Sequence, residues 1–449
     1  MKKAILTILA MALAGMAVFA QEKEMKTGFS FGVLPCATYS TDNGLQYGAF
    51  GDVYYFGDGS TYPDPLHKIS WEVSHFTKGR TRLYLAYDSK YLVPGMRFNA
   101  SVTYVDDPMY NFWGFNGTPA LQNYDLWANK ESLLHVGADG ARHGINYYGM
   151  SRKMFRVLAN VQGRITDNLN WAAGLNFWNW GLGSLDDKYG YDTNISLYNR
   201  YKETGAITED EADGGNALEI NAGLVYDTRD IEAAPNNGIW AEAYLNGNVL
   251  EHGYLKACAY FRQYISLPIH IFSAGDPVFA YRLAWQQTLA GETPVYMIQN
   301  VPLLVQRNMI SEGFGSGNTV RGIRENRILT EGFAWANLEL RVKLVSFKLL
   351  NQYFYVAVNP FFDAGVVTKG YRTEIFESAA NQLDPKLVAL GVDSHIYDPT
   401  KAGNVVTSAG AGLKIAMNQN FIVSVELAHC FNDELVADPW IGIGINYQF

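Results

Sequence analysis

Apolar and polar residues alternate along many stretches of the chain, most clearly at its C-terminal end. From residue 441 to residue 449, isoleucine, tyrosine and phenylalanine occupy every second position, and glycine or polar residues fill the positions between them. Such a period of two predicts a β-strand with one apolar face. We expect that face to contact lipid, because the residues between are small or polar.

Several of the alternating stretches carry charged residues on their second face. In residues 334–344, for example, Glu339 and Arg341 alternate with leucine and valine. A charge that faces lipid at mid-membrane costs roughly 2–4 kcal/mol, so we expect these side chains to face a lumen. Other lumen-facing charges, including Lys414 and Glu426, are most simply interpreted as a mixed-charge wall that hydrates and stiffens a barrel.

The alternation predicts an all-β fold, a transmembrane antiparallel β-barrel of about 16 strands. The predicted strands span residues 28–39, 44–57, 67–77, 80–89, 95–105, 150–164, 168–180, 216–228, 238–249, 253–267, 276–290, 333–346, 350–365, 404–417, 420–431 and 438–449. An even number of strands puts both termini on one side, which we expect to be the periplasm. The long connections, which then all face outside, are residues 106–149, 181–215, 291–332 and 366–403.

The composition agrees with a barrel and excludes other classes. The chain is 48% hydrophobic, 14% aromatic and 18% charged, whereas about 25% charged residues is usual. So many aromatic residues exclude a disordered chain. A net charge of −9 without a basic stripe argues against nucleic-acid binding. The three cysteines, Cys36, Cys258 and Cys430, are far apart and predict neither a disulfide framework nor a zinc site.

The first twenty residues have the features of a secretory signal. Lys2 and Lys3 precede a weakly apolar stretch, and Ala20 offers a small residue at the expected cleavage point. The alternative, a membrane anchor, is disfavoured because the stretch is short. We therefore expect residues 1–20 to be a cleaved signal peptide and residues 21–449 to form the barrel. Export without a helical anchor indicates the outer membrane of a Gram-negative bacterium.

Three short motifs go beyond a generic barrel. They are Val320-Arg321-Gly322-Ile323, Phe361-Phe362-Asp363-Ala364-Gly365, and Asp227-Thr228-Arg229-Asp230 followed by Pro235-Asn236-Asn237-Gly238. Together and in this order they resemble the BamA/TamA superfamily of bacterial surface-antigen barrels. That family has Val-Arg-Gly-Phe/Tyr at the tip of its sixth outer loop and Phe-x-Asp-x-Gly on its thirteenth strand. Ile323 departs from the first pattern by replacing the aromatic residue.

The resemblance implies that the long sixth outer loop folds back into the lumen and that its arginine meets an acidic partner on the wall. Arg321 can donate two parallel hydrogen bonds to the Asp363 carboxylate, and such a bidentate ion pair is stronger in a semi-occluded cavity than on an open surface. The alternative is an exposed loop arginine and an unrelated carboxylate. The candidate site residues are Val320, Arg321, Gly322, Phe361, Asp363 and Gly365 for this loop-to-wall lock, Asp227, Arg229 and Asp230 for a periplasmic turn, and Ile445, Tyr447 and Phe449 for a C-terminal strand signal.

The resemblance also implies a role in inserting or translocating proteins, through a weak seam between the first and last strands. Pro35 in the first strand, and Gly442 and Gly444 in the last, favour weak pairing there. An open seam could accept an incoming strand by β-augmentation. Relatives that insert or secrete proteins carry periplasmic POTRA modules, but only residues 21–27 precede this barrel, so we expect a POTRA-less branch.

The expected partners are the lipid bilayer, client outer-membrane or secreted proteins and a separate periplasmic protein. The chain has no Gly-x-Ser-x-Gly around a serine and no His-Glu-x-x-His spacing among its eight histidines. We therefore expect no enzymatic activity, no cofactor and no metal. The alternative function is a passive outer-membrane channel for small solutes or lipids, and a purely structural or adhesive role has the least support.

Overall fold

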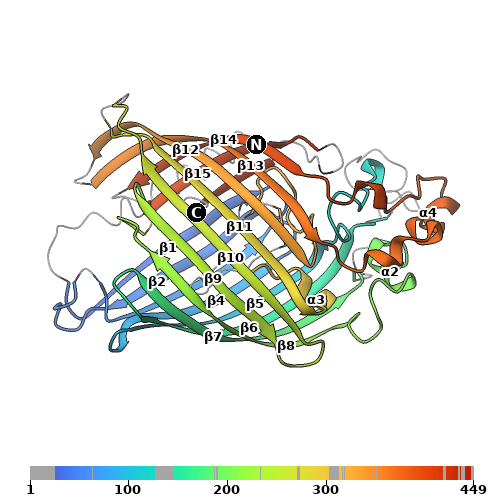
Figure 1. The fold of residues 1–449 in the computed structure, drawn as a ribbon, viewed down its shortest axis with the longest axis horizontal. Coiled ribbons are helices and arrows are strands. Elements are labelled where there is room, and N and C mark those ends of the chain that lie inside the picture. The colour runs from blue at the N-terminus through green and yellow to red at the C-terminus, as the bar shows by residue number, and fades with distance from the viewer. Residues whose placement is uncertain are drawn as a thin grey trace.

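The protein folds into a closed barrel of tilted strands, with helical segments beyond one of its ends (Figure 1). The computed structural model describes residues 26–62, 64–126, 145–186, 188, 191–232, 234–270, 274–302, 313–315, 317, 319–349, 352–417, 421–432, 435, 440–445 and 449. The predicted signal peptide, residues 1–20, lies outside these described residues. Within them, no helix is long and apolar enough to cross a membrane.

Sixteen antiparallel strands form the barrel, each paired with its neighbours in sequence, and β16 pairs with β1 to close it. The strands are β1 Phe29–Ser40, β2 Gly44–Tyr55, β3 His67–Phe76, β4 Thr81–Val93, β5 Met96–Asn111, β6 Gly149–Arg164, β7 Leu169–Gly183, β8 Gly214–Asp227, β9 Gly238–Asn248, β10 Tyr254–Ser266, β11 Val278–Gly291, β12 Gly332–Leu349, β13 Gln352–Lys369, β14 Val406–Met417, β15 Phe421–Cys430 and β16 Trp440–Ile445. The short helical segments are η2 Tyr124–Leu126, α2 Leu197–Glu203, α3 Val295–Ile298, η5 Thr373–Phe376, η6 Ala379–Gln382, α4 Pro385–Ala389 and η7 Pro399–Lys401.

The predicted barrel of about 16 strands is confirmed. Most of the predicted boundaries lie within three residues of the observed ones, but β4 and β13 each end four residues later than predicted and β5 ends six residues later. β5 continues to Asn111, whereas the sequence predicted its end at residue 105. The ladder goes on because Asp106 and Asp107 stand opposite Lys153 and Arg152 of β6, so that opposite charges face each other across the strands. The described part of β16 ends at residue 445, and residues 446–448 lie outside the part of the chain that the structure describes.

Burial alternates along the strands and defines an interior face and an exterior face. On β12, Asn337 and Glu339 are buried, whereas Leu338 and Leu340 are 38% and 37% exposed. On β13, Asp363 is buried and Phe362 is 42% exposed. The faces therefore follow the predicted parity, with apolar side chains outside and many polar and charged ones enclosed.

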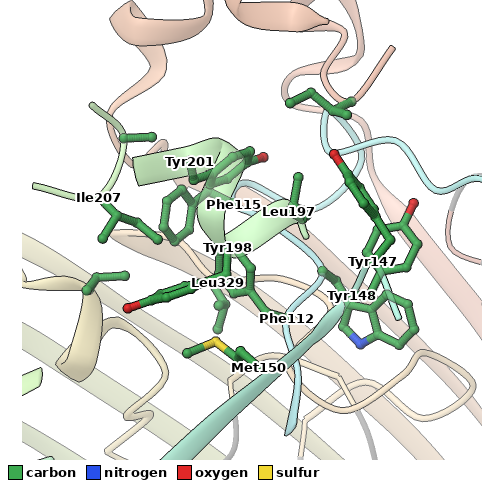
Figure 2. Close-up of a cluster of buried hydrophobic side chains, with 14 of the residues drawn as sticks. Phe112, Phe115, Tyr147, Tyr148, Met150, Leu197, Tyr198, Tyr201, Ile207 and Leu329 are labelled. Carbon is green, nitrogen blue, oxygen red and sulfur yellow. The ribbon is translucent and has the colours of Figure 1, made fainter. Parts of the chain in front are cut away.

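A cluster of aromatic side chains joins the long connections at the end of the barrel near α2 and α4 (Figures 1 and 2). Phe115, which follows β5, lies edge to face with Tyr371, their ring centroids 4.7 Å apart. The Phe115 ring also lies 5.2 Å from Tyr201 of α2. Connections far apart in sequence therefore pack as one unit.

Phe115→Ala should loosen this aromatic cluster. The side chain is fully buried, and removing a buried phenylalanine typically costs about 3–5 kcal/mol. We expect faster proteolysis of the connections between strands in purified protein, while the barrel keeps its compact, heat-modifiable form in SDS gels. Val388→Ala is the matched control, because Val388 is 56% exposed. Equal proteolysis of both variants would contradict the packing role of Phe115.

Candidate functional site

The structure brings Arg321 onto Asp363 of β13. The Arg321 main-chain N–H donates to Asp363 Oδ2 at 3.0 Å, its Nε to the same oxygen at 2.8 Å, and its Nη2 to Oδ1 at 2.8 Å. Both side chains are completely buried. This is the bidentate geometry that arginine and carboxylate groups favour. Folding of the whole sixth outer loop into the lumen stays a prediction, because residues 303–312 lie outside the described part.

Two further carboxylates and an aromatic ring surround the Arg321 guanidinium. Nη1 donates to Glu339 Oε1 of β12 at 2.6 Å and to Glu426 Oε1 of β15 at 3.4 Å. The guanidinium carbon lies 3.4 Å from the centroid of the Phe361 ring, a cation–π contact. Burial alone would lower the pKa of Arg321, but the surrounding carboxylates, Asp363 foremost, outweigh it and raise that pKa above its ordinary value. Arg321 therefore stays charged.

The site is balanced in charge by two more cations of the wall. Arg341 Nε donates to Glu339 Oε2 at 3.0 Å, and Lys414 Nζ donates to Glu426 Oε1 at 2.7 Å. In these contacts, three carboxylates face three cations. The sequence did not predict that four wall residues belong to this site, because their charges were interpreted as a general mixed-charge wall. These residues are Glu339, Arg341, Lys414 and Glu426. The alternation of apolar and polar residues predicts which face of the sheet each residue occupies. It does not predict the register between strands, which determines the residues that are neighbours across the sheet.

Two glycines, Gly322 and Gly365, allow the loop segment around Arg321 to lie close to the barrel wall. Gly322 has a φ of +86°, a conformation that favours glycine. A Cβ on it would stand 3.2 Å from the main-chain nitrogen of Cys430 and from Cβ of Ser408. A Cβ on Gly365 would overlap the ring of Phe333 and stand 3.3 Å from Val320. The loop segment therefore lies directly against β13, β14 and β15.

The second predicted group forms a compact turn after β8. Arg229 donates through Nε to Asp227 Oδ1 at 2.9 Å and through Nη2 to Oδ2 at 2.6 Å, and its guanidinium carbon lies 3.7 Å from the Trp240 ring. Asp230 instead accepts from the main-chain N–H groups of Asn236 and Asn237. A periplasmic position for this turn stays a prediction.

The third predicted group, the C-terminal strand signal, stays a prediction, but the exterior position expected for Phe449 is wrong. Phe449 was expected on the lipid-facing side of a strand, but it lies outside β16 and is buried against Tyr264 and Val278. Its main-chain oxygen accepts from Arg341 Nη2 at 2.5 Å, and this hydrogen bond explains the inward position. Tyr447 lies outside the described residues, as does the side chain of Ile445.

Comparison with known proteins assigns the chain to a family. The sequence profile of the Omp85 superfamily domain matches residues 93–432, which is more than half of the chain. The chain belongs to the Omp85 superfamily. This confirms the resemblance found in the sequence, and as an Omp85 barrel the protein is an integral outer-membrane protein. No curated protein matches the chain in sequence.

Solved structures of Omp85 proteins share the fold. A structure of BamA from Haemophilus ducreyi lacking POTRA domains 1–3 aligns with a TM-score of 0.53 at 15% identity, over 94% of this chain and 70% of that one. CdiB from Escherichia coli aligns with a TM-score of 0.54 at 10% identity, over 94% of this chain and 63% of that one. At such identities the likeness concerns the fold alone. Among the described residues, no group of three or more histidine, cysteine, aspartate or glutamate residues could hold a metal ion.

Arg321→Ala should strongly destabilise this Omp85 barrel. Removing one partner of a buried ion pair typically costs about 3–5 kcal/mol, because the remaining charges stay buried without compensation. We expect a lower urea midpoint for unfolding of the purified barrel in detergent. The control is Lys188→Ala, whose side chain is 63% exposed and lies 3.0 Å from Asp186. A midpoint as high as that of the control would contradict the role given to Arg321.

Proposed function

We propose that this Omp85 barrel assists the insertion or translocation of proteins at the outer membrane, through the seam between β1 and β16. One observation carries the proposal. Among the residues that the structure describes, β1 pairs with β2 over twelve residue pairs, from Phe29↔Tyr55 to Ser40↔Gly44, but with β16 over two, Tyr39↔Ile443 and Ser40↔Gly442. In the described part of the chain, each other pair of neighbouring strands aligns over at least six.

A short ladder makes separation of β1 and β16 less costly than separation of any other two neighbours. The main-chain groups that are set free would then be available to an incoming strand, which is how β-augmentation works. Pro35 lies within β1 and has no main-chain N–H to donate. The side chains of Phe29 and Phe31, also on β1, are largely exposed on the exterior face, where an incoming transmembrane strand would arrive.

The proposed partners follow from this mechanism. Client outer-membrane or secreted proteins would meet the seam, and a separate periplasmic protein would deliver them, with both termini on the periplasmic side. A passive channel for small solutes or lipids has less support, because the buried segment around Arg321 packs on the interior face and the aromatic cluster packs at one end.

The proposal is tested by closing the seam covalently. Residues directly opposite on antiparallel strands have Cα atoms about 4.5–5.5 Å apart, which suits a disulfide. Tyr39→Cys with Ile443→Cys, in a chain whose three native cysteines are alanine, should lower the level of at least one outer-membrane or secreted protein. A reductant should restore that level. The measurement is quantitative proteomics of outer-membrane and secreted fractions.

The control cross-link joins β1 to β2, through Ala37→Cys with Tyr47→Cys, which also stand opposite each other. It should leave both fractions unchanged, because that ladder does not need to open. Unchanged fractions with the seam cross-linked, and in a deletion strain, would refute the proposed function. Steady conductance of the purified protein in planar bilayers would instead favour the channel.

A further inference from the structure

The segment that carries Arg321 continues into two charged residues that reach the turn between β1 and β2. Arg324 Nη1 donates to the main-chain oxygen of Thr41 at 3.3 Å and lies 3.6 Å from Asp42 Oδ1. Asn43 donates through its side-chain amide to Glu325 Oε2. Arg324 and Glu325 are both buried, so these charge-assisted contacts are shielded from water and are stronger than on an open surface.

The same segment also contacts the strands on the other side of the seam. A Cβ on Gly317 would stand 3.8 Å from the ring of Trp440, the first residue of β16. Gly322 lies against the main chain of Cys430 in β15, as described above. Gly317 and residues 319–325 therefore contact both sides of the seam, β15 and β16 on one side and the β1–β2 turn on the other.

The turn that Arg324 and Glu325 contact carries hydrogen bonds of the seam itself. The Thr41 main-chain N–H donates to the Ile441 oxygen at 3.2 Å, and the Ile441 N–H donates to Thr41 Oγ1 at 3.0 Å. These bonds continue the two-residue ladder of Tyr39 and Ser40 with β16. Holding the turn in place therefore also holds the seam hydrogen bonds in register.

A second ion pair fixes the position of Glu325. Arg80, in the turn between β3 and β4, donates through Nη1 to Glu325 Oε1 at 3.1 Å and through Nε to Asp107 Oδ2 of β5 at 2.7 Å. Arg152 of β6 in turn lies 3.5 Å from Asp107. Alternating charges thus connect Glu325 to the wall at β5 and β6, away from the seam.

We propose that Arg324 and Glu325 form a clasp that keeps the β1–β16 seam closed at the β1–β2 turn. The clasp is distinct from the contact of Arg321 with Asp363, because it contacts the β1–β2 turn rather than β12, β13 and β15. The functional importance of the clasp rests on the proposed function, in which client proteins enter through the seam. A protein that opens must first release the clasp.

Amide hydrogen exchange of the purified protein in lipid nanodiscs tests the clasp without any client. Asn43→Asp places a carboxylate opposite Glu325 with almost no change of shape. A hydrogen bond to a charged group contributes about 1.5–3 kcal/mol, so exchange at Thr41 and Ile441 should become at least about tenfold faster. Arg324→Ala should act in the same direction. Adding Glu325→Gln to Asn43→Asp should largely restore slow exchange, because it removes the repulsion.

The control is Asn179→Asp, which makes the same chemical change at an exposed asparagine pair between β7 and β8. It should leave exchange at the seam unchanged. Unchanged exchange at the seam in both Asn43→Asp and Arg324→Ala would overturn the clasp. Equal acceleration in β13 and β14 would overturn it too, because the effect would then be global. Fast seam exchange with an unchanged outer-membrane proteome would refute the proposed function and keep the clasp.

Discussion

A guanidinium that is buried away from water must be neutralised where it stands, and this constraint fixes the position of Arg321. Carboxylates from β12, β13 and β15 surround it, and their remaining charge is met by Arg341 and Lys414. Removing the guanidinium would leave buried carboxylates without their partner, which is strongly destabilising. Gly322 and Gly365 are needed as well, because Arg321 reaches Asp363 only if the loop lies directly on the barrel wall. A side chain at either position would keep the loop away from the wall.

The position of the loop that carries Arg321 also affects the seam between β1 and β16. β1 and β16 share a ladder of two residue pairs, so their separation depends on whatever else connects the two sides. Gly317 and residues 319–325 make that connection, with glycine contacts to β15 and β16 and charged contacts to the β1–β2 turn. In this account the Arg321 network positions the loop, and Arg324 and Glu325 transmit that position to the seam.

Much of this architecture could be predicted from the sequence, because a period of two reports both the strands and their faces. The family resemblance of the motifs around Arg321 and Asp363 implied their pairing, and the structure places the two side chains within hydrogen-bond distance. Alternation could not show that Glu339 and Glu426 join Asp363, since register across strands depends on the whole sheet. Nor could it show that Phe449 turns inward or that β5 extends through Asp107, because both depend on cations distant in sequence. The clasp was missed for a similar reason, since Glu325 meets partners on turns far away in the chain.

The central claim is that the seam opens toward the membrane to receive another protein. Photo-crosslinking in native membranes tests it most directly, with a photoreactive amino acid in place of Phe31, which is 78% exposed on β1. We expect adducts with outer-membrane or secreted proteins, and fewer of them when the seam is closed by a disulfide. The same substitution at Leu175 of β7, which is 53% exposed, should give few such adducts. Adducts that are equally frequent at both positions, or with lipid alone, would contradict the account.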